Sequence, residues 1–321
     1  GYAKGNVLPH EETLPKHKMD RLQLMRHTYA NFSPILGLFA QKEQTIDQAL
    51  KNIAGNRPAD ITVTDIWQVI HRIWVIDDRQ TVDLIEKEMA DLKVYIADGH
   101  HRYETASAFA EEAAAQGKTG CDYLMLALIN LYDPGLVVFP THRLVKSLQG
   151  ISHHDLLSRL TEAGFTIMKI EDNKKEASLV ALLKRMAQGG KATPSFGLYI
   201  DQHFYLLQLN HKEKALKNVK PEKSLAYRHL DVTILHSLIL ENILHIGEKE
   251  LSEEGYISYT RDNQEAISAV DKGESACAFL MNSTLVEELL AVAEAGEKMP
   301  QKSTYFFPKV IAGLVINKLG E

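Results

Sequence analysis

The chain has 321 residues, of which 45% are hydrophobic, 24% charged and 7% aromatic, and these values exclude a disordered, collagen-like or coiled-coil protein. Its net charge of −6 argues against a general nucleic-acid-binding protein, which needs a basic face, although a local anion pocket stays open. The only two cysteines, Cys121 and Cys277, exclude a disulfide framework and suit a reducing compartment. Because no apolar run approaches the ~18–20 residues that cross a bilayer, we expect a cytoplasmic protein without a membrane partner.

In the first half of the chain, the apolar periodicity predicts alternating helices and strands. The expected helices cover 22–29, 44–58, 82–92 and 103–117, and the expected strands cover 35–39, 71–76, 94–97, 123–131 and 135–139. The clearest unit is the strand at 94–97, which breaks at Asp98-Gly99 and continues into a helix.

The pattern of apolar and polar residues changes near residue 151. Helices are expected at 152–163, 174–188 and 230–244, and strands at 165–170, 195–200 and 203–209; a last helix has Thr284 and Glu287 spaced for a capping box and Gly296 at its end. Five lysines in 211–223 predict a solvated connection rather than a nucleic-acid patch. The sequence therefore predicts a mixed α+β protein with one unit at 1–145 and an α/β region at 146–321, which holds a Lys-rich connection at 211–225.

The segment YIADGHHRYETA, residues 95–106, has the pattern of an anion site. Gly99 lets the backbone approach a ligand, and the first N–H groups of the helix carry partial positive charge. His100, His101 and Arg102 add side-chain donors, so phosphate is the expected guest. The alternative is a simple strand-to-helix turn whose histidines only cap or stack.

Several segments together resemble a prokaryotic family known as domain of unknown function 1015. The resemblance is carried by ADGHHRYETA at 97–106, HEET at 10–13, NFSPILGLF at 31–39, FPTHRLV at 139–145, LDVTILH at 230–236 and MPQKSTYFFPK at 299–309. These segments span nearly the whole chain in order.

A more distant similarity links the strand–Gly–x–x–Arg–helix pattern to the ParB/sulfiredoxin superfamily, which includes a CTP-driven DNA-segregation switch, a cysteine sulfinic acid reductase and free-serine kinases. The resemblance implies a sulfiredoxin-like N-terminal unit in which Gly99 is the turn glycine and His101 and Arg102 hold phosphate. It implies ATP or ADP as cofactor, with CTP as an alternative. His100 falls where the reductase has its nucleophilic cysteine, and a histidine cannot perform that reaction. The acidic composition argues against DNA segregation, and we expect no nucleic-acid partner.

Three carboxylates are candidates for metal or proton chemistry. Glu11 and Glu12 are adjacent and are able to hold Mg²⁺ or to act as a general base, with Glu11 as the expected base; the alternative is a solvated loop. Asp98 precedes the phosphate turn, where a carboxylate can hold Mg²⁺ against phosphates or simply form the turn.

Two further segments offer anion donors. His142 and Arg143 follow a strand and repeat the His-Arg pair, or form ordinary ion pairs at a strand end. Lys302, Ser303 and Thr304 lack the glycine spacing of a phosphate loop, yet Lys302 and Lys309 are able to close over an anion. We expect the segment 302–309 to fold back beside the 99–102 turn.

Three functions remain open. The first is a nucleotide-dependent phosphotransferase that acts on a small hydroxylated metabolite, with Glu11 and His100 in catalytic positions. The second is a non-catalytic module that binds a nucleotide as a regulator. The third is a metal-dependent hydrolase built from Glu11, Asp98, His100 and His101. The oligomeric state and the substrate are left open.

Overall fold

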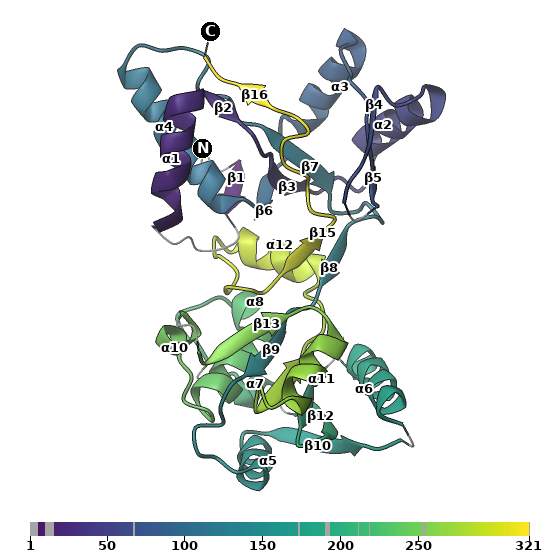
Figure 1. Ribbon diagram of the computed structural model, residues 1–321, viewed down its shortest axis with the longest axis vertical. Coiled ribbons are helices and arrows are strands. Elements are labelled where there is room, and N and C mark those ends of the chain that lie inside the picture. Colours follow the sequence, from purple (N-terminus) through teal and green to yellow (C-terminus); the bar gives the residue numbers. More distant parts are fainter. Residues whose placement is uncertain are drawn as a thin grey trace. The chain divides into compact units, whose positions relative to one another are not determined.

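The computed structural model describes residues 6–9, 16–66, 68–172, 174–189, 193–210, 212–217, 219–252 and 255–320. The chain divides into two compact units (Figure 1): unit 1 comprises Gly1–Val137 and Pro308–Glu321, and unit 2 comprises Val138–Phe307. The prediction placed the division at residue 145 and assigned the whole C-terminal half to one region. The structure instead divides the chain after residue 137 and returns residues 308–321 to unit 1.

Unit 1 is organised by a four-stranded mixed sheet with the order β1-β6-β3-β7. Strand β6 (Val94–Asp98) is parallel to β1 (Val7–Pro9) and antiparallel to β3 (Ile35–Phe39), which is parallel to β7 (Leu126–Asn130). All of β3 and all of β6 except Asp98 are buried, so both strands read as continuous apolar runs rather than alternating ones.

Four longer helices belong to unit 1 among the described residues. They are α1 (Lys16–Thr28), α2 (Thr45–Asn56), α3 (Arg79–Met89) and α4 (His100–Ala115). Helices α1 and α4 pack together (Figure 1), with Met25 and Phe109 in their shared core and a two-bond ion pair between Arg26 and Glu112. Strands β4 (Ile61–Thr64) and β5 (Ile70–Ile73) form a separate antiparallel hairpin. The predicted helix after Gly99 is confirmed and begins earlier than expected, at His100.

The last residues of the chain complete unit 1. Strand β16 (Asn317–Lys318) pairs antiparallel with β2 (Ala30–Asn31), and the Leu319 backbone N–H donates to the Tyr29 carbonyl at 2.7 Å. Leu319 is buried in the α1–α4 core. The core of unit 1 is therefore built from both ends of the chain.

Unit 2 is organised by a six-stranded sheet with the order β10-β12-β11-β14-β9-β13, antiparallel throughout. The strands are β9 (His142–Val145), β10 (Phe165–Ile170), β11 (Ser195–Ile200), β12 (His203–Leu209), β13 (Ile257–Thr260) and β14 (Cys277–Leu280). The predictions for β10, β11 and β12 are confirmed to the residue. A further two-stranded pairing joins β8 (Val137–Phe139) to β15 (Tyr305–Phe307).

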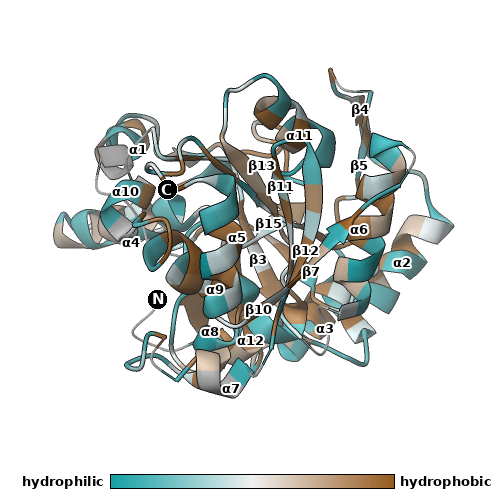
Figure 2. Ribbon diagram, turned by 90° about the horizontal axis from the view of Figure 1, so that it is seen from below, coloured by the Kyte–Doolittle hydropathy of each residue, from teal (hydrophilic) through white to brown (hydrophobic). Residues whose placement is uncertain are grey.

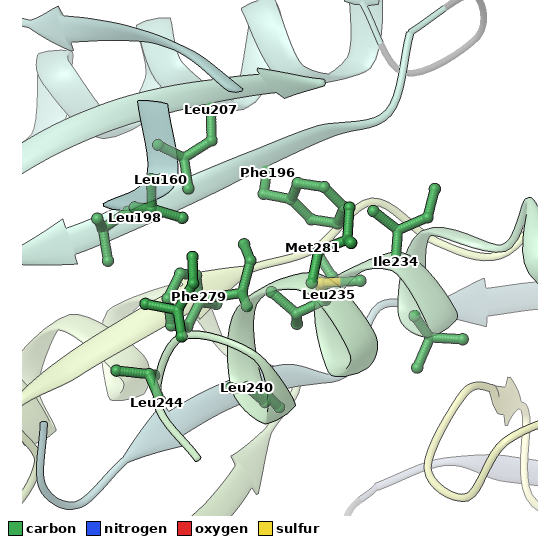
Figure 3. Packing of buried hydrophobic residues seen from close by; sticks show 14 of the residues in the cluster. Leu160, Phe196, Leu198, Leu207, Ile234, Leu235, Leu240, Leu244, Phe279 and Met281 are labelled. Atoms are coloured by element: carbon green, nitrogen blue, oxygen red, sulfur yellow. The ribbon is translucent and has the colours of Figure 1, made fainter. Parts of the chain in front are cut away.

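Helices cover both faces of this sheet. One core contains residues from the sheet together with α5 (His153–Glu162), α9 (Asp231–Ile234), the π-helical segment η2 (Leu235–Glu241) and α12 (Val286–Glu294). The other contains residues from α6 (Lys175–Gly189) and α11 (Asn263–Asp271). Side chains of β12 alternate between the two cores, as the period of two in a strand requires. Figure 3 shows part of the first core. Figure 2 shows hydrophobic residues, in brown, along strands of the sheet.

The helix predicted at 230–244 is confirmed over 231–241, where it begins as a short α-helix and continues as η2. Two other local predictions for unit 2 were wrong. The connection at 211–225 is not only solvated, because it forms α7 (Lys212–Ala215) and buries Leu216 and Val219 in the first core. The last helix is not capped by Thr284, because Leu285 occupies the cap position and donates its N–H to Glu288 at 2.8 Å. The predicted helix end at Gly296 is confirmed, with φ of 74°.

In the described ranges, no helix combines the length and the apolar character that crossing a membrane requires.

Candidate phosphate-binding site

The turn between β6 and α4 depends on Gly99. This residue is the N-cap of α4 and has φ of 95°, in the left-handed region that side chains disfavour. A Cβ atom placed on Gly99 would lie 2.8 Å from both Nε and Nη2 of Arg102. Glycine is therefore required twice, once by the backbone and once by the guanidinium that lies against it.

Arg102 is committed to contacts within unit 1. Its Nη2 donates to Asp98 Oδ2 at 2.7 Å, and its Nη1 donates to the Ser33 hydroxyl and to the Pro34 carbonyl. Burial lowers the pKa of the guanidinium, and the Asp98 carboxylate partly opposes that change. The sequence predicted that Arg102 binds a phosphate. In this structure its guanidinium instead connects α4 to Ser33 and Pro34, which directly precede β3.

Lys309 supplies a second cation at the same carboxylate. Its Nζ lies 3.0 Å from Asp98 Oδ1, so each carboxylate oxygen of Asp98 accepts from a different cation. The Lys309 side chain is 36% exposed and that of Asp98 is 43% exposed, against 20% for Arg102. Lys309 is thus the more accessible of the two cations, and the three charges together leave an excess of positive charge at the start of α4.

The first turn of α4 adds the field of the helix. The N-cap makes no side-chain hydrogen bond, because glycine has no side chain to accept from the first turn. The Tyr103 N–H donates to the Gly99 carbonyl at 3.0 Å, which closes the turn. His100 is buried and His101 is half-buried. Of the two histidines, His101 is therefore the more accessible to a ligand.

His142 and Arg143 lie inside unit 2 and do not offer donors to a ligand in this structure, contrary to the prediction. His142 is fully buried and its Nδ1 accepts from the Met281 N–H at 3.1 Å; burial and the nearby Arg143 lower its pKa to about 4. Arg143 is also buried and donates to the Thr141 carbonyl, to the Lys302 carbonyl at 3.1 Å and to His236 Nε2 at 3.4 Å.

The predicted segment 302–309 is divided between the units. Lys302 is exposed in unit 2, where Ser303 is buried and donates to the Pro300 carbonyl, and Thr304 is half-buried. Lys309 belongs to unit 1, and it does reach the 98–102 turn. The anion-binding role of Lys302, Ser303 and Thr304 remains a prediction.

The predicted metal ligands are only partly within the described residues. Glu11 and Glu12 lie outside them. Asp98 is described, and both of its oxygens accept from cations, so its surroundings do not fit a Mg²⁺ ligand as they stand. Among the described residues no group of three or more His, Cys, Asp or Glu side chains is arranged to hold a metal ion.

Sequence reasoning missed Ser33 and Pro34. They immediately precede β3, and β3 pairs with β6 so that Leu36 lies opposite Asp98. The segment NFSPILGLF carries the predicted strand at 35–39 and part of the family resemblance, but the prediction gave its polar start no role in the site. In this segment, polar residues come directly before a buried strand. That pattern could have indicated that Ser33 and Pro34 lie at the end of a neighbouring strand.

The fold and the site together define a two-unit α+β protein with a strand–glycine–helix turn and cations gathered on one carboxylate. The chain belongs to the family described as "Protein of unknown function (DUF1015)", whose model matches residues 1–233. No curated protein matches the chain.

Several solved structures are similar to the chain at low identity. A structure described as "Free serine kinase (E30A mutant) in complex with AMP" is 14% identical, with 98% of this chain and 89% of that chain covered and a TM-score of 0.47. A conserved hypothetical protein from Pyrococcus furiosus is 16% identical, with 98% and 92% covered and a TM-score of 0.40. SbnI from Staphylococcus aureus, truncated at its C-terminus, is 12% identical, with 98% and 84% covered and a TM-score of 0.45.

Proposed function

We propose that the start of α4 binds the phosphate groups of a nucleotide, and that the protein is a nucleotide-dependent phosphotransferase acting on a small hydroxylated metabolite. The observation that carries the proposal is the contact of Lys309 with Asp98, which brings a half-exposed cation from the end of the chain to the glycine turn. An anion placed there meets a helix N-terminus and a net positive charge.

The adenine nucleotides ATP and ADP are the first candidates, with CTP as the alternative. Phosphoryl transfer depends mainly on positioning and on stabilising negative charge, which is the chemistry that a lysine and a helix N-terminus supply. In this proposal Lys309 contacts the phosphates, the backbone at Gly99 allows their close approach, and Arg102 positions Asp98 and the turn. Glu11 remains the proposed base. The two cysteines are free and buried, which supports our assignment to the cytoplasm.

A thermal-shift series tests binding. ATP, ADP, CTP and inorganic phosphate are compared on the unaltered protein, on Lys309→Met and on Lys318→Met, which removes an exposed lysine from the same terminal segment. We expect nucleotide to raise the melting temperature of the unaltered protein and of Lys318→Met, with at least about tenfold weaker binding to Lys309→Met, as the loss of one charge-assisted bond implies. Equal shifts in the two lysine variants would contradict the proposal. Arg102→Ala is a poorer probe, because it also removes the contacts to Ser33 and Pro34.

Turnover is tested separately by ³¹P NMR with ATP and a panel of small alcohols that includes L-serine and glycerol. Glu11→Gln is expected to keep the nucleotide-induced thermal shift and to lose phosphate transfer. Transfer at an undiminished rate would show that Glu11 is not the base.

A non-catalytic nucleotide-binding module is the second candidate. It is favoured by the engagement of Asp98 with two cations, which leaves this carboxylate organised as part of an ion-pair cluster rather than as a metal ligand. Nucleotide binding without transfer to any alcohol in the panel would support the module over the enzyme.

A further inference from the structure

A cavity in unit 1 lies away from the glycine turn. It has a volume of about 420 Å³ and is lined by residues of β3, β7, α2 and α3. Phe39 lines it at the C-terminal end of β3, whereas the Asp98 site lies opposite Leu36 near the start of that strand. Three residues of a strand span roughly 10 Å, so the two places are separate along the sheet.

The cavity wall is mainly apolar. Its apolar residues include Phe39, Ile46, Leu50, Ile85, Met89 and Leu128. Its size falls within the range of small-molecule sites, which are typically apolar with a few fixed polar groups. No lysine, arginine or histidine is among the described residues that line it.

Two carboxylates supply the charge in this wall, and each is held by the protein through one oxygen. Asp47 Oδ2 accepts from Asn130 Nδ2 at 2.6 Å, and Asp133 Oδ1 accepts from the Gly135 N–H at 2.7 Å. Within the described part of the chain neither carboxylate forms an ion pair.

Asn130 fixes Asp47 in place. It is 1% exposed, donates to the Gln41 carbonyl at 2.8 Å and to Asp47, and accepts from the Gln41 and Tyr132 N–H groups at 3.2 and 3.3 Å. With both donors and its acceptor engaged, this amide has one stable orientation. Asp47 is therefore held at the cavity by a buried side chain rather than left to move with solvent.

We propose that this cavity binds a small organic cation, with its ammonium group at Asp47 and Asp133 and its hydrocarbon body against the apolar wall. A primary ammonium on an aromatic or branched alkyl body matches a wall that is apolar and carries only negative charge. A hydrated metal ion is a poorer match, because Mg²⁺ and Ca²⁺ need several oxygen ligands and keep water, which an apolar wall does not replace. The proposal does not depend on nucleotide binding at Gly99.

Paired probes of equal shape separate charge from hydrophobic contact. Benzylamine is compared with benzyl alcohol, and cyclohexylamine with cyclohexanol, by isothermal titration calorimetry on the full chain at neutral pH. We expect each amine to bind at least about tenfold more tightly than its alcohol, as one charge-assisted bond implies. Met89, labelled with ¹³C at its methyl group, should change its chemical shift as the amine is added.

The matched variants are Asp47→Asn, which keeps the shape and removes the charge, and Asp91→Asn, which removes an exposed charge just after α3 and away from the cavity lining. Asp47→Asn is expected to weaken amine binding about tenfold or more while the alcohol is unaffected; Asp91→Asn should bind like the unaltered protein. Amine and alcohol binding equally, full binding by Asp47→Asn, or a Met89 methyl that does not move would each overturn the proposal. So would an Asp47-dependent response to Mg²⁺ or Ca²⁺ in place of the amine.

Discussion

Substitution of Gly99 by alanine tests the packing of the turn directly. Alanine at φ of 95° costs about 1–2 kcal/mol of backbone strain. Its Cβ would also lie 2.8 Å from the Arg102 guanidinium, which cannot retreat without loosening its bonds to Asp98, Ser33 and Pro34. Loss of one bond to a charged group adds about 1.5–3 kcal/mol. We therefore expect Gly99→Ala to destabilise the protein by about 2.5–5 kcal/mol.

Two other glycines of unit 1 serve as matched controls in urea unfolding. Gly117 has φ of 72° but open space around a Cβ, so Gly117→Ala should show only the backbone cost of about 1–2 kcal/mol. Gly55 lies inside α2 with no neighbour within 4 Å and no left-handed φ, so Gly55→Ala should stabilise by about 0.5–1 kcal/mol. The double variant Gly99→Ala with Arg102→Ala should lose the steric part of the penalty. The reasoning fails if Gly99→Ala costs no more than Gly117→Ala.

Three further predictions concern unit 2. Burial, reinforced by the nearby Glu288, raises the pKa of Asp231 to about 7. The free energy of unfolding should therefore fall as the pH rises from about 4 to 7. Asp231→Asn should stabilise the protein by about 2–4 kcal/mol in urea unfolding at pH 8. A flat pH profile in both proteins would contradict this. The pKa of His142 is lowered to about 4, so ¹⁵N NMR should show a neutral imidazole down to that pH. The free energy of unfolding that this neutral, buried histidine contributes should decrease as the pH falls from about 6.5 to 4. Titration of the imidazole near pH 6.5 would show that His142 is exposed. A Cβ on Gly197 would lie 2.9 Å from Leu182 Cδ2 and 3.0 Å from Met186 Sδ. Gly197→Ala should therefore lower the thermal midpoint, at a cost in stability of about 1–3 kcal/mol. An unchanged midpoint would show that the side chains of α6 move aside without cost.

Periodicity predicted the elements that bury a regular face. Strands β10, β11 and β12 alternate between two cores, and the pattern is strong enough to give their ends. The segment 230–244 is buried at most positions rather than along one stripe, so its spacing could not reveal the change from α-helix to π-helix. The cap of α12 was missed by one residue, because adjacent glutamates, Glu287 and Glu288, both lie in its first turn and the sequence does not show which one accepts from the cap N–H.

The candidate site was predictable where it depends on local chemistry. The need for glycine at position 99 follows from a strand that turns directly into a helix. The partners of Arg102 in the loop before β3 were not predictable, because Ser33 and Pro34 meet the guanidinium only through the pairing of β3 with β6. The approach of Lys309 to the turn agrees with the expectation that the segment 302–309 folds back beside it. His142 and Arg143 have the residue types of an anion site, and only the burial of β9 within its sheet shows that both side chains are enclosed by unit 2.

The order in which unit 1 is assembled has a consequence for biosynthesis. Its chain is interrupted by the whole of unit 2, and the segment that carries Lys309 and β16 leaves the ribosome after unit 2. Unit 2 is continuous and is able to fold during translation, since domains usually fold as units while the chain emerges. Unit 1 must wait for the residues that follow unit 2, so a ribosome that stops after residue 307 releases a polypeptide without Lys309. The ion-pair cluster at Asp98 therefore forms only after all of unit 2 has been synthesised.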